Sequence, residues 1–319
     1  NPAYPCLESL RKQGEGSAML YPRYFMKILI TGCGMLGYDL CRVLENEELF
    51  CLDIAEPHFP LPTSHFQPCD ITDFEKTYQT ITKINPEIVI HTAAWTDVDG
   101  AEKNQKEAYR LNVLGTRNIA LACQRFDAAV VYISSDYVFD GEKKEPYTEF
   151  DKPNPLSIYG KSKYYGEVMV RQLLNKFFIV RSSWLYGTNG KNFVKTIVEK
   201  SKTEKELKIV DDQIGSPTYT KDLAEAIVAL LPTGLYGTYH ITNSNSCSWY
   251  EFAKKIIRQS EVRSPKSEVK VEPITSEGLN RPAKRPKNSQ LKNFVWELNG
   301  FEPLRNWQDA VSDYLRTTM

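Results

Sequence analysis

Three side chains of this 319-residue sequence have the types and spacing of a proton-transfer site. Tyr159 and Lys163 are four residues apart, so in a helix they lie one turn apart on the same face. A nearby ammonium group favours the phenolate, and we expect it to lower the pKa of Tyr159 from its usual value of about 10. The tyrosine can then pass a proton to a carbonyl oxygen as hydride arrives, while Ser135 polarises the same oxygen. Alone, such a pair is also common on a solvated helix face.

A glycine-rich turn supplies a candidate cofactor site. It stands between an apolar run and an amphipathic run and reads Gly32-Cys33-Gly34-Met35-Leu36-Gly37. Glycines permit a tight turn that brings the backbone close to a pyrophosphate at a helix N-terminus. Asp53 follows the next predicted strand, where a carboxylate can bind an adenosine ribose and favour NADH, although it can also be a loop or cap residue. We expect NADPH or NADH as the cofactor.

The elements that would position these residues alternate between short β-branched runs and longer amphipathic runs. The predicted strands are 27–31, 49–52, 87–91, 129–133 and 177–181. The predicted helices are 35–45, 73–83, 105–125, 157–174 and 193–200. The alternation predicts an α/β fold with a doubly wound, Rossmann-like parallel sheet. Such sheets bind ligands at the carboxyl ends of their strands, which is where most of the candidate residues fall.

The pattern also suggests a division of the chain. We expect residues 26–185 to form mainly a dinucleotide-binding domain, and residues 186–319 mainly a smaller C-terminal substrate lobe, with some segments returning to the first domain. Residues 1–25 mix proline, glycine and charge before a run at Met26 that reads like a natural start. We therefore interpret them as an extension outside the fold.

Composition argues against several functional classes. Lys plus Arg and Asp plus Glu are equal at 40 each, so no net charge attracts the chain to nucleic acid or to a membrane surface. The seven cysteines are scattered without CxxC spacing, which favours reduced thiols over a metal site. No apolar run approaches the roughly 20 residues that span a bilayer. We expect a cytoplasmic protein without metal, membrane or nucleic-acid partners.

Several strings carry a family resemblance: HTAAWTDVD (91–99), ISSDYVFDG (133–141), RSSWLYG (181–187), DQIGSPT (212–218) and RPKNS (285–289). With the glycine turn, they resemble the extended short-chain dehydrogenase/reductase family, whose catalytic residues would be Ser135, Tyr159 and Lys163. Within it, the sequence is most similar to dTDP-4-dehydrorhamnose reductases, from Met26 almost to the C-terminus. This likeness implies NAD(P)H-dependent reduction of C4 of dTDP-4-dehydro-β-L-rhamnose, the last step of dTDP-rhamnose biosynthesis. Homodimers are common among such relatives.

The resemblance also implies binding residues. The cofactor set comprises Gly32, Gly34, Met35, Leu36, Gly37, Asp53, Asp70, Ile71, Ala93, Ala94, Trp95, Tyr159 and Lys163. The substrate set comprises Ser135, Asp136, Trp184, Asn192, Gln213, Arg285 and Asn288. Several of these have plain alternatives: the two tryptophans can be core aromatics, Arg285 a solvated charge and Asn192 a turn residue.

Two departures and two alternative functions accompany this interpretation. The glycine motif is one residue shorter than the family's GxxGxxG, and Ser135 stands where these reductases commonly have threonine. A related nucleotide-sugar epimerase or dehydratase would use the same residues, but the acidic pair typical of dehydratases is missing beside Ser135. The regulatory subunit of methionine adenosyltransferase, a noncatalytic binding protein, has a string similar to 133–141. The strings at 97–99 and 212–218 favour the enzyme.

Overall fold

The structure, a computed structural model, describes residues 25–57, 60–61, 65–261, 269–279 and 281–318. Within these residues, seven parallel strands form the central sheet in the order β11-β6-β5-β4-β1-β2-β3. Their bounds are β1 Lys27–Thr31, β2 Glu48–Asp53, β3 Phe66–Pro68, β4 Ile88–His91, β5 Ala129–Ser135, β6 Phe177–Ser182 and β11 Gly237–His240. The predicted extension, residues 1–25, lies outside the described residues except for Phe25.

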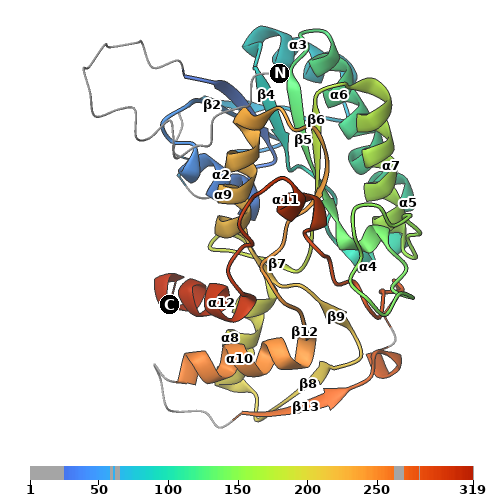
Figure 1. The fold of residues 1–319 in the computed structure, drawn as a ribbon, viewed down its shortest axis with the longest axis vertical. Coiled ribbons are helices and arrows are strands. Elements are labelled where there is room, and N and C mark those ends of the chain that lie inside the picture. The colour runs from blue at the N-terminus through green and yellow to red at the C-terminus, as the bar shows by residue number, and fades with distance from the viewer. Residues whose placement is uncertain (1–24, 58–59, 62–64, 262–268, 280, 319) are drawn as a thin grey trace.

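Helices cover both faces of this sheet (Figure 1). Alternation along β1 is the reason: Ile28 and Ile30 point to one face and Leu29 to the other, so each face buries its own core. One core packs under α2 (Met35–Val43) and α9 (Thr220–Leu230). The other packs under α3 (Phe74–Ile84), α6 (Thr116–Gln124) and α7 (Ile158–Leu173). The predicted doubly wound fold is confirmed.

The predicted elements match the observed ones with informative differences. Each of the five predicted strands is present, but β5 and β6 run on to Ser135 and Ser182. The predicted helix 105–125 is divided into α5 (Gln105–Tyr109), a π-helical segment (Arg110–Gly115) and α6. Two further short helical segments were not predicted: α4 (Val98–Lys103) and a 3₁₀ turn at Asp136–Val138, directly after Ser135. The two edge strands, β3 and β11, were not predicted.

A second layer of structure follows β6. Its elements are β7 Leu185–Tyr186, α8 Phe193–Thr203, β8 Glu206–Val210, β9 Ile214–Gly215, β10 Thr218–Tyr219, β12 Cys247–Ser248, α10 Trp249–Glu261, β13 Lys270–Ile274 and α12 Trp307–Thr318, with a 3₁₀ turn at Ser276–Leu279. Tyr186, Val198, Phe252 and Tyr314 belong to the buried core of this lobe. By contrast, α9, the 3₁₀ turn Leu231–Thr233, β11 and α11 (Phe294–Leu298) pack with the first sheet. The boundary at residue 185 stays a prediction.

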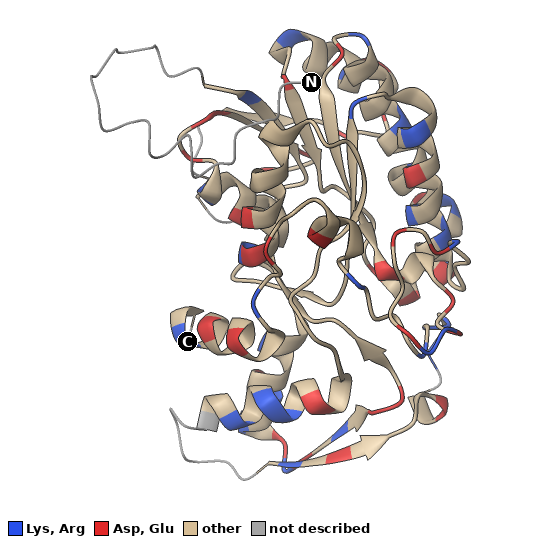
Figure 2. Ribbon diagram, in the orientation of Figure 1, with Lys and Arg blue, Asp and Glu red and all other residues tan. Residues whose placement is uncertain are grey.

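Charge and cysteine positions are also visible in the fold. Figure 2 shows blue and red segments interspersed along the helices. Among the described residues, no helix is both long and apolar enough to span a bilayer. The six cysteines in the described part of the chain are free and buried, and Cys6 lies outside it.

Candidate active site

A cavity of about 670 Å³ runs along the carboxyl ends of the central strands. The strand order β2-β1-β4-β5-β6 arranges its walls in sequence: Asp53 at the end of β2, Gly32 after β1, Ala93 after β4, Ser135 at the end of β5 and Trp184 after β6. Thirteen predicted site residues line this cavity: Gly32, Gly34, Met35, Leu36, Asp53, Ile71, Ala93, Ala94, Ser135, Asp136, Tyr159, Lys163 and Trp184. Cofactor and catalytic residues, far apart in sequence, therefore share one space.

The glycine turn needs its glycines for two different reasons. Gly32 has φ +86°, and a Cβ there would stand 2.4 Å from the backbone nitrogen of Ala93. A Cβ on Gly37 would stand 2.1 Å from the carbonyl oxygen of Gly32, so this glycine allows α2 to pack against the turn without lining the cavity. Around Gly34, the N-cap of α2, the structure leaves open space beside the helix N-terminus. A pyrophosphate fits such a cradle.

Asp53 ties this turn to the neighbouring strand. Its Oδ2 accepts a hydrogen bond from the backbone nitrogen of Cys33 at 2.7 Å, and its Oδ1 accepts one from the nitrogen of Ile54 at 2.7 Å. The carboxylate also lines the cavity. Asp53, the last residue of β2, thus has a structural role and also lies where a cofactor ribose would bind.

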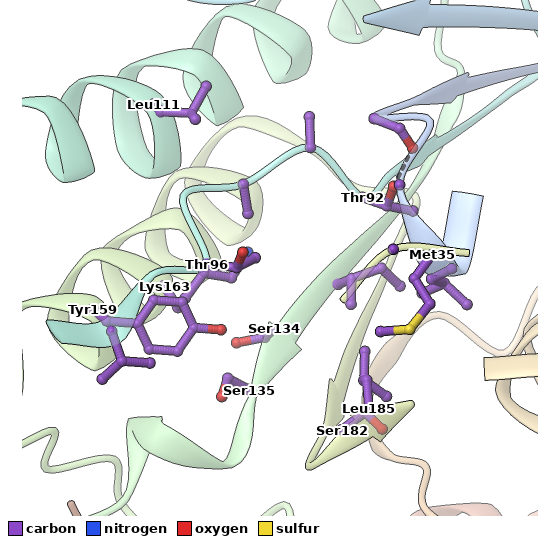
Figure 3. A pocket seen from close by; sticks show the side chains of 18 of the residues that line it. Met35, Thr92, Thr96, Leu111, Ser134, Ser135, Tyr159, Lys163, Ser182 and Leu185 are labelled. Carbon is purple, nitrogen blue, oxygen red and sulfur yellow. Dashed lines mark hydrogen bonds between the residues drawn. The ribbon is translucent and has the colours of Figure 1, made fainter. Parts of the chain in front are cut away.

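The start of α7 positions Tyr159 and Lys163. Ser157 caps the helix by accepting a hydrogen bond from the nitrogen of Gly160 at 3.1 Å. Ser162 donates to the carbonyl of Tyr159 at 2.8 Å and accepts from the Asn112 side chain at 2.8 Å. Asn112 lies in the π-helical segment, so its hydrogen bond to Ser162 links this segment to α7. Figure 3 shows the Tyr159 ring with its hydroxyl directed toward Ser134 and Ser135.

Burial sets the protonation state of Tyr159. It raises the pKa of Tyr159 to about 12, Ser135 acts in the opposite direction, and Asp136 raises the pKa further. The expectation that Lys163 would lower this pKa overall is therefore wrong for this arrangement, because loss of hydration is the largest effect. A phenol that keeps its proton at neutral pH suits a proton donor.

Lys163 is buried more deeply than Tyr159, with 3% of its surface exposed. Burial lowers the pKa of Lys163 to about 7, and the carboxylate of Glu167 acts against that shift. The ammonium nitrogen lies 4.4 Å from the centroid of the Tyr132 ring. Nearby, burial lowers the pKa of His91 to about 3, and the neutral ring is held between Thr31 and Thr116. Beside Tyr159, Lys163 can therefore carry a positive charge, whereas His91 is neutral at neutral pH.

Asp136 stands beside Ser135 with one oxygen unpaired. The Ser135 hydroxyl donates to Oδ1 of Asp136 at 3.0 Å and accepts from the nitrogen of Tyr137 at 3.1 Å. Oδ2 of Asp136 is buried and makes no hydrogen bond of normal geometry, and burial raises the pKa of Asp136 to about 7 against the opposing effects of Ser289 and Ser135. A buried polar atom of this kind is costly unless a ligand pairs with it. Asp136 is therefore prepared to contact a polar substrate group.

The structure does not bring every predicted residue to the cavity. Those that do not line it are Gly37, Asp70, Trp95, Asn192, Gln213, Arg285 and Asn288. Asn192 caps α8 through the nitrogen of Lys195 at 3.0 Å, as in its alternative interpretation. Arg285 forms a bidentate ion pair with Asp99, in which Nη1 donates to Oδ1 at 3.1 Å and Nη2 donates to Oδ2 at 2.8 Å. The binding roles of these residues stay predictions.

Other lining residues were missed by sequence reasoning. They include Thr92, Thr96, Ser134, Tyr137, Ser182, Ser183, Lys191 and Trp249. Ser134 and Tyr137 could have been found, because they flank Ser135 and Asp136 in the string at 133–141. Nothing in the sequence marks Trp249, which reaches the cavity through the pairing of β9 with β12.

Comparisons with known proteins show the family to which the chain belongs. Residues 26–319 match the family described as RmlD substrate binding domain. Spore coat polysaccharide biosynthesis protein SpsK of Bacillus subtilis (strain 168) is 39% identical over 293 residues, covering 91% of this chain and 97% of that protein. The dTDP-4-dehydrorhamnose reductase of Streptomyces griseus is 36% identical over 300 residues, covering 92% and 93%.

A solved structure supports the same family assignment. The crystal structure of dTDP-4-dehydrorhamnose reductase from Bacillus anthracis str. Ames, in complex with NADP, superposes with a TM-score of 0.85. It is 43% identical, and the match covers 92% of this chain and 100% of that one. The chain therefore belongs to the RmlD substrate binding domain family, within the doubly wound α/β folds.

Proposed function

We propose that this protein reduces the C4 carbonyl of dTDP-4-dehydro-β-L-rhamnose to dTDP-L-rhamnose with NADPH or NADH, the last step of dTDP-rhamnose biosynthesis. One observation carries the proposal: the glycine turn, Ser135, Tyr159 and Lys163 line a single cavity. The names of the relatives from Streptomyces griseus and Bacillus anthracis support the substrate, and the NADP in the second supports the cofactor.

The cavity walls fit a dinucleotide in this proposal. Gly32, Gly34, Met35 and Leu36 would hold the pyrophosphate at the start of α2, where backbone N–H groups and the helix dipole favour negative charge. Asp53 would bind the adenosine ribose, with Ile71 beside the adenine. Ala93 and Ala94, whose short side chains leave room, would line the path toward Tyr159.

In the reaction, Tyr159 donates its proton to the carbonyl oxygen at C4. A reduced nicotinamide supplies the hydride when it is bound. Because the pKa of Tyr159 is raised to about 12 by burial, the phenol carries its proton at neutral pH. Lys163, one helical turn away, stabilises the phenolate that develops. Ser135 would polarise the carbonyl by donating its hydroxyl proton to it in place of Oδ1 of Asp136.

Asp136 and Trp184 would recognise the sugar nucleotide. The unpaired Oδ2 of Asp136 offers an acceptor to a sugar hydroxyl beside Ser135. Trp184 lies beyond Ser135, on the side of the cavity away from Asp53, and presents an apolar face. Four further residues do not line this cavity, and we propose that they contact the substrate at a greater distance from Tyr159: Asn192, Gln213, Arg285 and Asn288.

The test is the loss of NADPH or NADH absorbance with enzymatically generated dTDP-4-dehydro-L-rhamnose. We expect rapid oxidation by the wild type and a fall of at least a hundredfold in kcat for Tyr159→Phe, because general acid catalysis contributes about 10²–10⁴-fold. Binding of NADPH, followed by its fluorescence, should be similar in the two proteins. No oxidation with either cofactor would refute the proposal.

Four expectations about context accompany it. We infer that the protein works in the cytoplasm, that it needs no nucleic-acid partner, that it forms homodimers, and that its substrate lobe begins near residue 186. The equal numbers of acidic and basic residues support the second. Size-exclusion chromatography with light scattering tests the third, and a monomer at micromolar concentration would contradict it.

A further inference from the structure

Two tryptophans lie stacked at the β6 end of the cavity. The ring centroids of Trp184 and Trp249 are 3.6 Å apart and their planes differ by 9°. Both side chains line the cavity. Ser135 ends β5 and Trp184 follows β6, so the pair lies beyond Ser135 and away from Asp53. This is the side on which the substrate, not the cofactor, would bind.

The backbone of Trp184 needs support from its surroundings. Its φ is +47°, in the left-handed region that bulky residues rarely adopt and that persists only where neighbouring groups enforce it. The carbonyl of Trp184 accepts a hydrogen bond from the nitrogen of Thr218 at 3.3 Å. A Cβ on Gly215 would stand 2.4 Å from Cε2 of Trp184, so the indole rests against bare backbone. These contacts fix the main chain and one side of the ring.

The chain delivers Trp249 to the same place by strand pairing. Cys247 of β12 lies opposite Gly215 of β9 in an antiparallel pair, and Trp249 follows β12 as the first residue of α10. This pairing therefore brings Trp249 close to Gly215, which itself lies against the indole of Trp184. The Phe193 ring, at the start of α8, lies 4.5 Å from Trp249 and ties it to the core of the lobe.

We propose that Trp249 is a positioning residue of the substrate site, which fixes the indole of Trp184 as an aromatic wall for a nucleoside diphosphate sugar. The inference rests on the proposed function and deepens it. Without Trp249, the Trp184 indole loses its stacking partner and samples other rotamers. The free energy of substrate binding is then less favourable, because binding must also order the indole of Trp184. Tyr159, Lys163 and Ser135 belong to α7 and β5, so the chemical step is unaffected.

Steady-state kinetics of Trp249→Ala test this directly. We expect the KM for dTDP-4-dehydro-L-rhamnose to rise about tenfold, the size that aromatic pairs of this kind justify, while kcat stays within about twofold. Trp249→Phe should recover most of the loss. Tyr250→Ala is the matched control, because Tyr250 is the next residue of α10 and does not line the cavity. The Kd of NADPH, measured by fluorescence, should be the same in all variants.

A double-mutant cycle shows whether Trp249 acts through Trp184. The variant Trp184→Ala/Trp249→Ala should be no worse than Trp184→Ala, whereas losses that add would overturn the inference. An unchanged KM in Trp249→Ala, or an equal loss of NADPH affinity, would overturn it as well. If Trp249→Ala does not fold, KM must rise from Trp to Phe to Leu at this position. If the wild type does not reduce the substrate, the proposed function itself is refuted. If the wild type reduces it and the KM does not depend on Trp249, only the positioning role of Trp249 is refuted.

Discussion

Replacing Glu167 by glutamine should destabilise the protein by about 3–5 kcal/mol, the range for removing one partner of a buried ion pair. Glu167 is fully buried, and its two carboxylate oxygens accept hydrogen bonds from Nε and Nη2 of Arg181, each at 2.8 Å. Ser134 donates to it at 2.6 Å and Arg171 at 2.9 Å. Arg181 is only 1% exposed, so glutamine would leave a buried guanidinium without the carboxylate that is hydrogen-bonded to it.

Urea unfolding followed by circular dichroism measures this loss. With a slope of about 3 kcal/mol/M, the midpoint of the Glu167→Gln variant should fall by roughly 1–1.7 M. Arg171→Ala, which removes the partly exposed partner, should cost at most about 1 kcal/mol. The double variant Glu167→Gln/Arg181→Met should recover much of the loss, because it removes the stranded charge. A loss below 1 kcal/mol for Glu167→Gln would refute this reasoning.

Three further results are expected. Burial lowers the pKa of Lys163 to about 7, so between about pH 7 and 10.5 the unfolded chain binds a proton that the folded protein lacks, and stability rises with pH. Lys163→Met should flatten this rise in unfolding free energy, and an unchanged slope would contradict it. In differential scanning fluorimetry, Gly32→Ala should lower the Tm by several degrees because its Cβ would meet Ala93, whereas Gly34→Ala should not; equal effects would disprove the packing argument. Asp53→Ala should weaken NADH binding more than NADPH binding in fluorescence titrations, and equal losses would assign Asp53 a purely structural role.

The sequence predicts the centre of the fold well because the signals there are local. A strand such as 27–31 is apolar, buried on both faces and followed at once by glycines, so periodicity and turn chemistry agree. The edge strands carry weaker signals. β3 is three residues long with one partly buried and two exposed side chains, and β11 has four residues, of which two are only partly buried and one of these is a glycine. Their places depend on pairing with β2 and β6, which no short window contains.

The same dependence on long-range contacts explains which residues of the site could be predicted from the sequence. Ser135, Tyr159 and the glycine turn were predicted because each belongs to a short motif. Trp249 was missed because only the β9–β12 pairing brings it to the cavity. The direction of the pKa shift of Tyr159 was wrong because spacing reveals a nearby lysine but not the extent of burial, which dominates. The pKa of a buried side chain can therefore be predicted only from the folded structure.

The central claim is tested most directly by tracing hydride into the product. Wild-type protein would be incubated with dTDP-4-dehydro-L-rhamnose and NADPH carrying deuterium at both C4 positions of the nicotinamide. Mass spectrometry with NMR should find dTDP-L-rhamnose with one deuterium at C4 of the sugar. Tyr159→Phe should form it at least a hundredfold more slowly. Absence of the labelled sugar, or a label at any other carbon, would contradict the account.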